Sequence, residues 1–256
     1  MKRLIVVPFL CGAIAGIGMA LADPTAARFY RAVLILSAAA TMISAYMTTA
    51  RFAPGDKLFT SWLFIGIGYT LSTIRYSIRL IGMLRGADLP IPRHALDAML
   101  ILQNLAIAIA LLMFVLAWRS TGLTAGQSRG SLIAFGIIVA LVVGGYPLLQ
   151  GFQTRGADTV LLISTLGDVV GIALIVPLVL SAMALRGGLL MHTWLYLALC
   201  EFFWLLYDVW LAVREHLVSA RAGAGIEQMI RVTAIMFAFI ATVAQRRAAP
   251  RGRATT

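Results

Sequence analysis

The chain is an almost unbroken series of apolar stretches, each close to the length that crosses a lipid bilayer. A helix needs about 20 consecutive apolar residues to span the hydrocarbon core. Charged or helix-breaking residues separate the stretches. The windows of this length cover residues 4–22, 30–49, 59–83, 95–118, 131–150, 159–184, 192–213 and 228–245. We therefore expect an all-α fold, a polytopic helical membrane bundle of about eight transmembrane helices.

The composition points to lipid as the main solvent of the folded chain. Hydrophobic residues make up 61% of it and charged residues 12%, and the mean hydropathy is +0.93. Soluble proteins are about 45–50% apolar and 25% charged. The connectors between the windows are too short to hold a soluble domain. We expect a single transmembrane bundle over 1–245 and a disordered basic tail over 246–256.

The two halves of the chain resemble each other weakly. Expected helix starts recur at a shift of roughly 130 residues, and Trp62 in the third window corresponds to Trp194 in the seventh. This favours a duplicated four-helix unit with halves 1–125 and 126–245, which would be parallel because four spans return the chain to its starting side. The alternative is that any array of similar apolar windows looks periodic.

The charge distribution favours a lipid partner and gives an orientation. The net charge is +11, and basic ends facing anionic lipid explain it better than nucleic acid does. Both ends are basic, so we expect both termini in the cytoplasm and the chain in the bacterial inner (plasma) membrane. Residues 1–22 also imitate a cleavable signal peptide. We treat them as a helix because their apolar run is longer than the usual signal-peptide core, and cleavage would leave seven spans.

The residue inventory excludes several chemistries. A retinal Schiff base is excluded because the only lysines, Lys2 and Lys57, lie outside the expected helices. A metal or haem site needs converging histidines, but His94, His192 and His216 all fall at helix ends. No nucleophile motif or phosphate loop is present. We expect no metal, no cofactor and no enzymatic activity.

Three carboxylates lie inside apolar windows and mark the candidate site. Asp168 is in the sixth window, and Glu201 and Asp208 are in the seventh. A charged side chain at a helix centre in the membrane costs roughly 2.5 kcal/mol or more, so such residues face a protein interior or a wet cavity. Trp204 shares a helical stripe with Glu201 and Asp208. We expect these four residues to line a cavity.

The third window adds a polar stripe that faces the same cavity. Tyr69 and Tyr76 are spaced two turns apart on one face of the helix, and Arg75 lies on an adjoining stripe. Polar side chains of this kind can also simply join helices by hydrogen bonds worth about 0.6 kcal/mol. We include all three residues in the expected ligand cavity.

Helix depth suggests a specific ion pair across the two halves. If Trp62 and Trp194 mark the same interface, Arg75 lies about 20 Å along its helix and Asp208 about 21 Å along its own. An ion pair with supporting hydrogen bonds makes buried charges tolerable. We hypothesise that Arg75 and Asp208 form a salt bridge. The alternative is that Arg75 reaches a membrane interface alone.

One region resembles a known class of proteins. The ordered features are Gly167-Asp168, Pro177-Leu178, Arg186-Gly187-Gly188, Trp194 and Tyr207-Asp208. This order resembles the bacterial polytopic membrane sensor domains that precede diguanylate cyclase or histidine kinase modules. The resemblance covers about 50 residues, and it implies sensing. Because no output domain follows here, it also implies a separate signalling partner.

These observations lead to a primary function and an alternative. The primary expectation is a non-enzymatic membrane sensor or accessory protein whose polar intramembrane cavity responds to a small ligand or a proton. The alternative is a proton- or cation-coupled secondary transporter that uses midplane carboxylates. An intramembrane lipid enzyme would need a nucleophile–base or metal constellation that the sequence does not contain.

Overall fold

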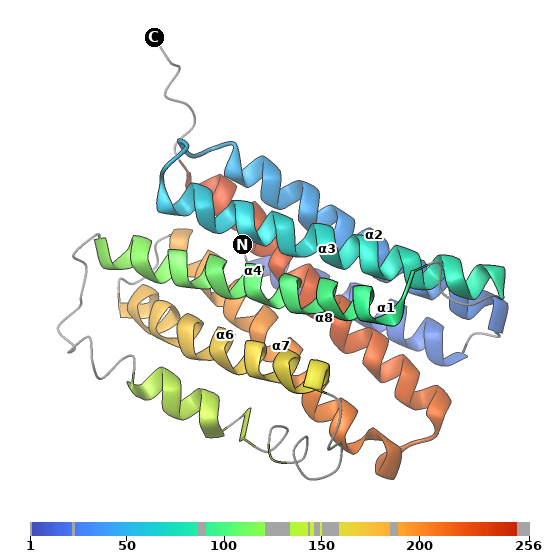
Figure 1. The fold of residues 1–256 in the computed structure, drawn as a ribbon. Helices are drawn as coiled ribbons and strands as arrows, with labels where there is room; N and C mark the ends of the chain where they lie inside the picture. The colour runs from blue at the N-terminus through green and yellow to red at the C-terminus, as the bar shows by residue number, and fades with distance from the viewer. Residues whose placement is uncertain are drawn as a thin grey trace.

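The computed structural model describes residues 2–21, 24–86, 91–120, 134–142, 144–145, 149, 159–184 and 189–249, and the regular secondary structure in this part of the chain is helical. Figure 1 shows the helices running side by side in one bundle. The elements are η1 (Lys2–Ile5), α1 (Val6–Leu21), α2 (Pro24–Thr49), α3 (Lys57–Arg85), α4 (Arg93–Ser120), α6 (Thr159–Ala184), α7 (Leu189–Leu217) and α8 (Ala220–Ala248). Residues 134–142 are also helical.

The fold is that of a helical membrane protein. Five helical segments are long and apolar enough to cross a bilayer, and they are Tyr30–Thr49, Arg93–Trp118, Leu162–Leu180, Leu190–Leu211 and Ala220–Ala248. The apolar helix Val6–Leu21 is shorter. Helix α3 has sufficient length but is not among the five, and it carries the polar stripe and the arginines Arg75 and Arg79. The predicted span 131–150 lies partly outside the described residues.

Six helices close a ring around a common interior. The neighbouring pairs in order are α2 with α3, α3 with α4, α4 with α6, α6 with α7, α7 with α8, and α8 with α2. Helix α1 packs against α8 and α2. Helices α3 and α7 are not neighbours, so their side chains can approach each other only across the interior of the ring. This interior holds the candidate site.

Glycines permit the close packing of α1 on α8. A Cβ atom added at Gly12, Gly16 or Gly225 would overlap backbone or side-chain atoms of the facing helix. Small residues of this kind let two helix backbones approach in a membrane. The Thr233 hydroxyl of α8 also donates a hydrogen bond of 3.5 Å to the carbonyl of Pro8. Helices α1 and α8 are therefore joined directly.

Hydroxyl groups line the contact between α2 and α8. Thr41 Oγ1 donates to the carbonyl of Ile235 over 3.2 Å as well as to its own helix. Ser44 and Thr242 are hydrogen-bonded through their hydroxyls. All of these hydroxyl-bearing side chains are buried. Each hydroxyl thus has a hydrogen-bond partner within the protein although it is buried away from water, as buried polar groups require.

Three aromatic rings fill one end of the ring of helices. Phe114 of α4 packs edge-to-face on Trp62 of α3 at 5.1 Å and on Trp194 of α7 at 4.9 Å between ring centroids. Both tryptophans are buried, so they lie inside the bundle rather than at a lipid interface. Because both contact one phenylalanine, they lie at one level. We call these three residues the aromatic seal.

Some helix boundaries differ from the predicted ones. Helix α6 covers the predicted range, but α8 begins at Ala220 instead of residue 228. Ser219 caps its start by accepting a hydrogen bond from the Ala222 amide over 3.4 Å. The other end is longer too, because Arg246 and Arg247 lie in the last turn of α8. The start of the predicted tail 246–256 is therefore helical, and residues 250–256 lie outside the described part.

Candidate ligand cavity

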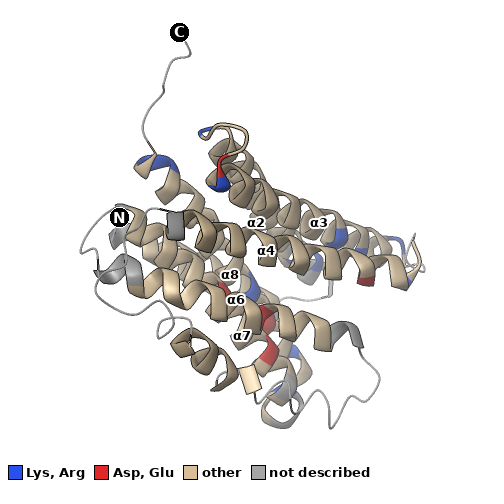
Figure 2. Cartoon of the chain, turned by 60° about the vertical axis from the view of Figure 1, so that its left-hand side comes forward, with Lys and Arg blue, Asp and Glu red and all other residues tan. Residues whose placement is uncertain are grey.

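A cavity of about 110 Å³ lies inside the ring, where α3, α4, α6, α7 and α8 face one another. That volume has room for several water molecules or one small ligand. All seven predicted site residues line it: Tyr69, Arg75 and Tyr76 from α3, Asp168 from α6, and Glu201, Trp204 and Asp208 from α7. Figure 2 shows acidic and basic positions gathered midway along the bundle. We call this the inner cavity.

Two of the carboxyl groups lie close together. The Asp168 carboxyl of α6 interacts electrostatically with the Asp208 carboxyl of α7, and both line the inner cavity. Asp208 is 5% exposed, and Asp168 is partly buried. Two neighbouring carboxylates repel each other when both are ionised, so the pair favours a state in which one of them holds a proton.

The third carboxyl group packs against glycine. Glu201 is 5% exposed, and its Oε2 atom occupies the space that a Cβ atom of Gly171 would take. One turn earlier on α6, Gly167 gives the same kind of room to Asn104 of α4. Asn104 Nδ2 donates to Ser164 Oγ over 3.1 Å. Small residues on α6 thus make room for polar side chains from both neighbouring helices.

Arg75 lies in the inner cavity without an acidic partner. It is 9% exposed, and its Nε atom has no hydrogen-bond partner. Its guanidinium carbon lies 5.8 Å from the centre of the Tyr76 ring. Ion pairs among the described residues join Arg214 and Arg231 to Glu227. Arg75 takes part in neither pair.

The predicted salt bridge between Arg75 and Asp208 is therefore wrong, although both residues line the inner cavity. The depth argument placed them at one level along the bundle. However, α3 and α7 are not neighbours in the ring, so equal depth does not bring the two side chains together. Asp208 interacts electrostatically with Asp168 on the adjacent helix α6.

Tyr69 of α3 contacts α7 across the interior of the ring. Its hydroxyl lies 3.6 Å from Cys200 Sγ. Cys200 is 3% exposed and its thiol is free, as is that of Cys11. The tyrosine therefore contacts α7 one residue before the carboxylate.

Arg231 is the main cavity residue that the predicted set omits. Its guanidinium lies 4.9 Å from the Tyr76 ring centre and 5.5 Å from that of Tyr207. Its Nη1 atom donates to Glu227 Oε1 over 3.2 Å. The predicted window 228–245 puts Arg231 within one turn of its start, near a membrane interface. The observed start places it about 16 Å into the helix. The Ser219 cap is the signal that could have located it.

A second cavity, of about 160 Å³, adjoins the first. We call it the vestibule. Tyr76 and Arg231 line both cavities. The polar groups that line the vestibule alone are Arg31, Arg79, Glu227 and Gln228. Because the side chains of Arg31 and Arg79 are exposed, the vestibule reaches the surface. Tyr76 and Arg231 therefore lie between the inner cavity and the vestibule.

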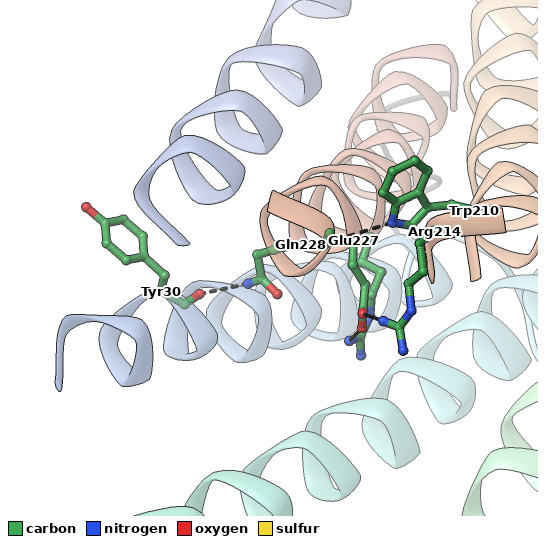
Figure 3. Close-up of polar contacts among 7 residues, drawn as sticks. Tyr30, Trp210, Arg214, Glu227 and Gln228 are labelled. Atoms are coloured by element: carbon green, nitrogen blue, oxygen red, sulfur yellow. Dashed lines mark hydrogen bonds and ion pairs between the residues drawn. The ribbon is translucent and has the colours of Figure 1, made fainter. Parts of the chain in front are cut away.

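Polar contacts hold the vestibule walls together, as Figure 3 shows. Glu227 Oε2 accepts a hydrogen bond of 2.7 Å from Arg214 of α7, while its other oxygen accepts from Arg231. Gln228 Nε2 donates to the carbonyl of Tyr30 on α2 over 2.8 Å. Helix α8 is thereby tied to both neighbours beside the vestibule. These contacts fix the position of Arg231.

Comparisons with known proteins give no relative. No protein-family model matches the chain, and no curated protein or solved structure matches it either. Within the described residues, no group of three or more His, Cys, Asp or Glu side chains is placed to hold a metal ion. The hinge Arg186-Gly187-Gly188 of the sensor resemblance lies outside the described residues. The function must therefore be inferred from the two cavities themselves.

Proposed function

We propose that the protein is a non-enzymatic integral membrane sensor or accessory protein whose inner cavity responds to a small ligand or a proton. The observation that carries the proposal is that Asp168 and Asp208, from the adjacent helices α6 and α7, line one cavity together with Glu201 and Arg75. Ionisable groups within membrane helices are costly and mark functional sites. Because the two aspartates come from different helices, a change in their protonation would alter the repulsion between α6 and α7.

The proposed topology has eight spans with both termini in the cytoplasm of the bacterial inner membrane. It rests on the five apolar helical segments, on α1, α3 and the window 131–150 as further spans, and on the basic ends. A parallel 4+4 repeat is part of the proposal. Exchanging the halves 1–125 and 126–245 maps α2 onto α6, α3 onto α7 and α4 onto α8, and the neighbours around the ring are preserved.

With this topology the two ends of the ring face opposite sides of the membrane. The aromatic seal lies near the starts of α3 and α7, which face the cytoplasm. The vestibule lies near the start of α8 and the end of α3, which face outward. The inner cavity is then reached from outside the cell. The response passes to a separate signalling protein, as the resemblance to sensor domains implies.

A pH titration of tryptophan fluorescence in lipid nanodiscs tests the proposal. Trp204 lines the inner cavity, so its emission reports on the carboxyl pair. We expect a pH-dependent change that disappears in Trp204→Phe and in Asp168→Asn. Asp97→Asn is the matched control because Asp97 of α4 lines neither cavity. Identical titrations of the native protein and Asp168→Asn would contradict a proton-responsive site.

The second candidate is a proton- or cation-coupled secondary transporter. The preserved neighbours around the ring favour it, because many transporters are built from internal repeats with a site between the halves. Proteoliposomes with an internal pH-sensitive dye separate the two functions. A sensor gives no net proton flux. Flux in the native protein that is lost in Asp208→Asn would establish the transporter and reject the sensor.

A further inference from the structure

The vestibule has an excess of positive charge. Three arginines line it, Arg31 of α2, Arg79 of α3 and Arg231 of α8, and Glu227 is the only carboxylate among the lining residues that the structure describes. Glu227 is already bonded to Arg214 and Arg231. Among the described residues neither Arg31 nor Arg79 forms an ion pair. Two guanidinium groups from different helices therefore face one pocket with no acidic partner.

The charge continues inward from the surface. Arg31 and Arg79 are exposed, the Arg231 side chain is 14% exposed, and Arg75 is 9% exposed. Arg75 and Arg79 are one turn apart on α3, so the helix presents them to the inner cavity and the vestibule in succession. The Nε atoms of Arg75 and Arg231 both lack hydrogen-bond partners. These two Nε–H groups are therefore available as hydrogen-bond donors beside the positive charge of the arginines.

We infer that the vestibule binds an anionic oxygen group, a carboxylate or a phosphate. The planar guanidinium fork matches both groups with paired hydrogen bonds, which a lysine ammonium cannot reproduce. A cavity of about 160 Å³ accepts such a group but not a large solute. Placed in it, the anion contacts Arg79, Arg31 and the outer side of Arg231.

The position of Arg231 links anion binding in the vestibule to the inner cavity. Its guanidinium lies between Tyr76 and Tyr207, and it borders both cavities. An anion that draws Arg231 outward changes the wall of the inner cavity next to the carboxyl pair. Anion binding in the vestibule would give the ligand class of the proposed sensor, and its physiological meaning rests on that proposed function. The binding itself is independent of it.

The anionic group has two sources, a free solute or a lipid headgroup, and the test separates them. Purified protein in a neutral detergent is titrated with inorganic phosphate against chloride at constant ionic strength, and its melting temperature is recorded. The same protein is placed in nanodiscs of phosphatidylcholine with and without phosphatidylglycerol. A ligand that binds only the folded state raises the melting temperature.

We expect phosphate to raise the melting temperature, and Arg79→Gln or Arg31→Gln to weaken its apparent affinity by about tenfold, since a charge-assisted hydrogen bond is lost. Arg79→Lys should restore only part of it. Arg85→Gln, also exposed on α3 but lining neither cavity, is the matched control and should match the native protein. Because both altered side chains are exposed, these variants retain the fold.

Three outcomes are informative. A phosphate shift that depends on Arg79 identifies a free anion. No phosphate shift, together with a phosphatidylglycerol shift lost in Arg79→Gln, identifies a lipid headgroup. No shift in either arm, or an equal loss in Arg85→Gln, overturns the inference. Asp168→Asn should retain anion binding, so failure of the proton-responsive function and failure of this inference are distinguishable.

Discussion

The two ends of the ring of helices are filled by opposite means. At the aromatic seal, Trp62, Phe114 and Trp194 close the interior by shape alone. At the other end Arg231 and Glu227 occupy the interior, and space remains on either side of them. Apolar rings pack to crystal-like density because any close contact is favourable. Charged groups must keep particular partners, and their geometry leaves cavities.

The largest expected effect comes from opening the seal. Phe114→Ala removes a fully buried ring that contacts both tryptophans, and we expect a loss of about 3–5 kcal/mol in the free energy of unfolding. Chemical denaturation in detergent, followed by circular dichroism, measures it. In a Cys11→Ala background, Cys200 should also be alkylated faster. Phe135→Ala is the control, since Phe135 is 49% exposed, and a comparable loss there would remove the distinction between the ends.

A smaller effect is expected beside the inner cavity, where Gly171 of α6 makes room for the Glu201 carboxyl. Gly171→Ala places a methyl group against the Glu201 carboxyl, and displacing that carboxyl should cost about 1–3 kcal/mol. Gly223→Ala is the matched control, because an added Cβ there meets only Val218 at an ordinary 3.6 Å, and it should stabilise α8 by up to about 1 kcal/mol. Thermal unfolding of both variants gives the comparison.

A double-mutant cycle then identifies the cause at Gly171. In a Glu201→Ala background the cost of Gly171→Ala should fall by at least about 0.5 kcal/mol, because the overlapping carboxyl is absent. If the costs of the two substitutions were strictly additive, the added methyl group would be in conflict with the helix backbone and not with the Glu201 carboxyl. The surroundings of the inner cavity would then be as rigidly packed as the aromatic seal.

The smallest effect is expected at the contact between α2 and α8. Thr41→Val keeps the shape of a buried side chain and removes its hydrogen bond to Ile235, so we expect a loss of about 0.6 kcal/mol. Melting temperature in detergent is sufficient to measure it. A loss of several kcal/mol would show that hydroxyl groups between helices contribute as much to the stability of the bundle as the aromatic seal does.

Much of this arrangement could be predicted from the sequence. Membrane helices are recognised by the length of their apolar runs, and polar stripes are recognised by the spacing of their residues. The seven site residues were predicted as one group, and the structure places all of them around one cavity. Spacing along a helix determines which residues share a face. The cost of charge in lipid indicates that this face points inward.

The pairing of side chains could not be predicted in the same way. Depth along the helices placed Arg75 level with Asp208, but the order of helices around the ring decides which faces meet, and it depends on packing between distant segments. The predicted window 228–245 starts eight residues after the observed start of α8, because glycines at 223 and 225 are usually helix breakers. Gly225 is instead a contact point for Gly16 and Ala20 of α1.

The contact between α1 and α8 has a consequence for biosynthesis. The hydrogen bond from Thr233 to Pro8 spans 225 positions of the chain, and the glycine faces of the two helices have no other described partner of this kind. During translation α1 is made well before α8. Helix α1 must therefore remain without this partner until α8 has been synthesised and inserted.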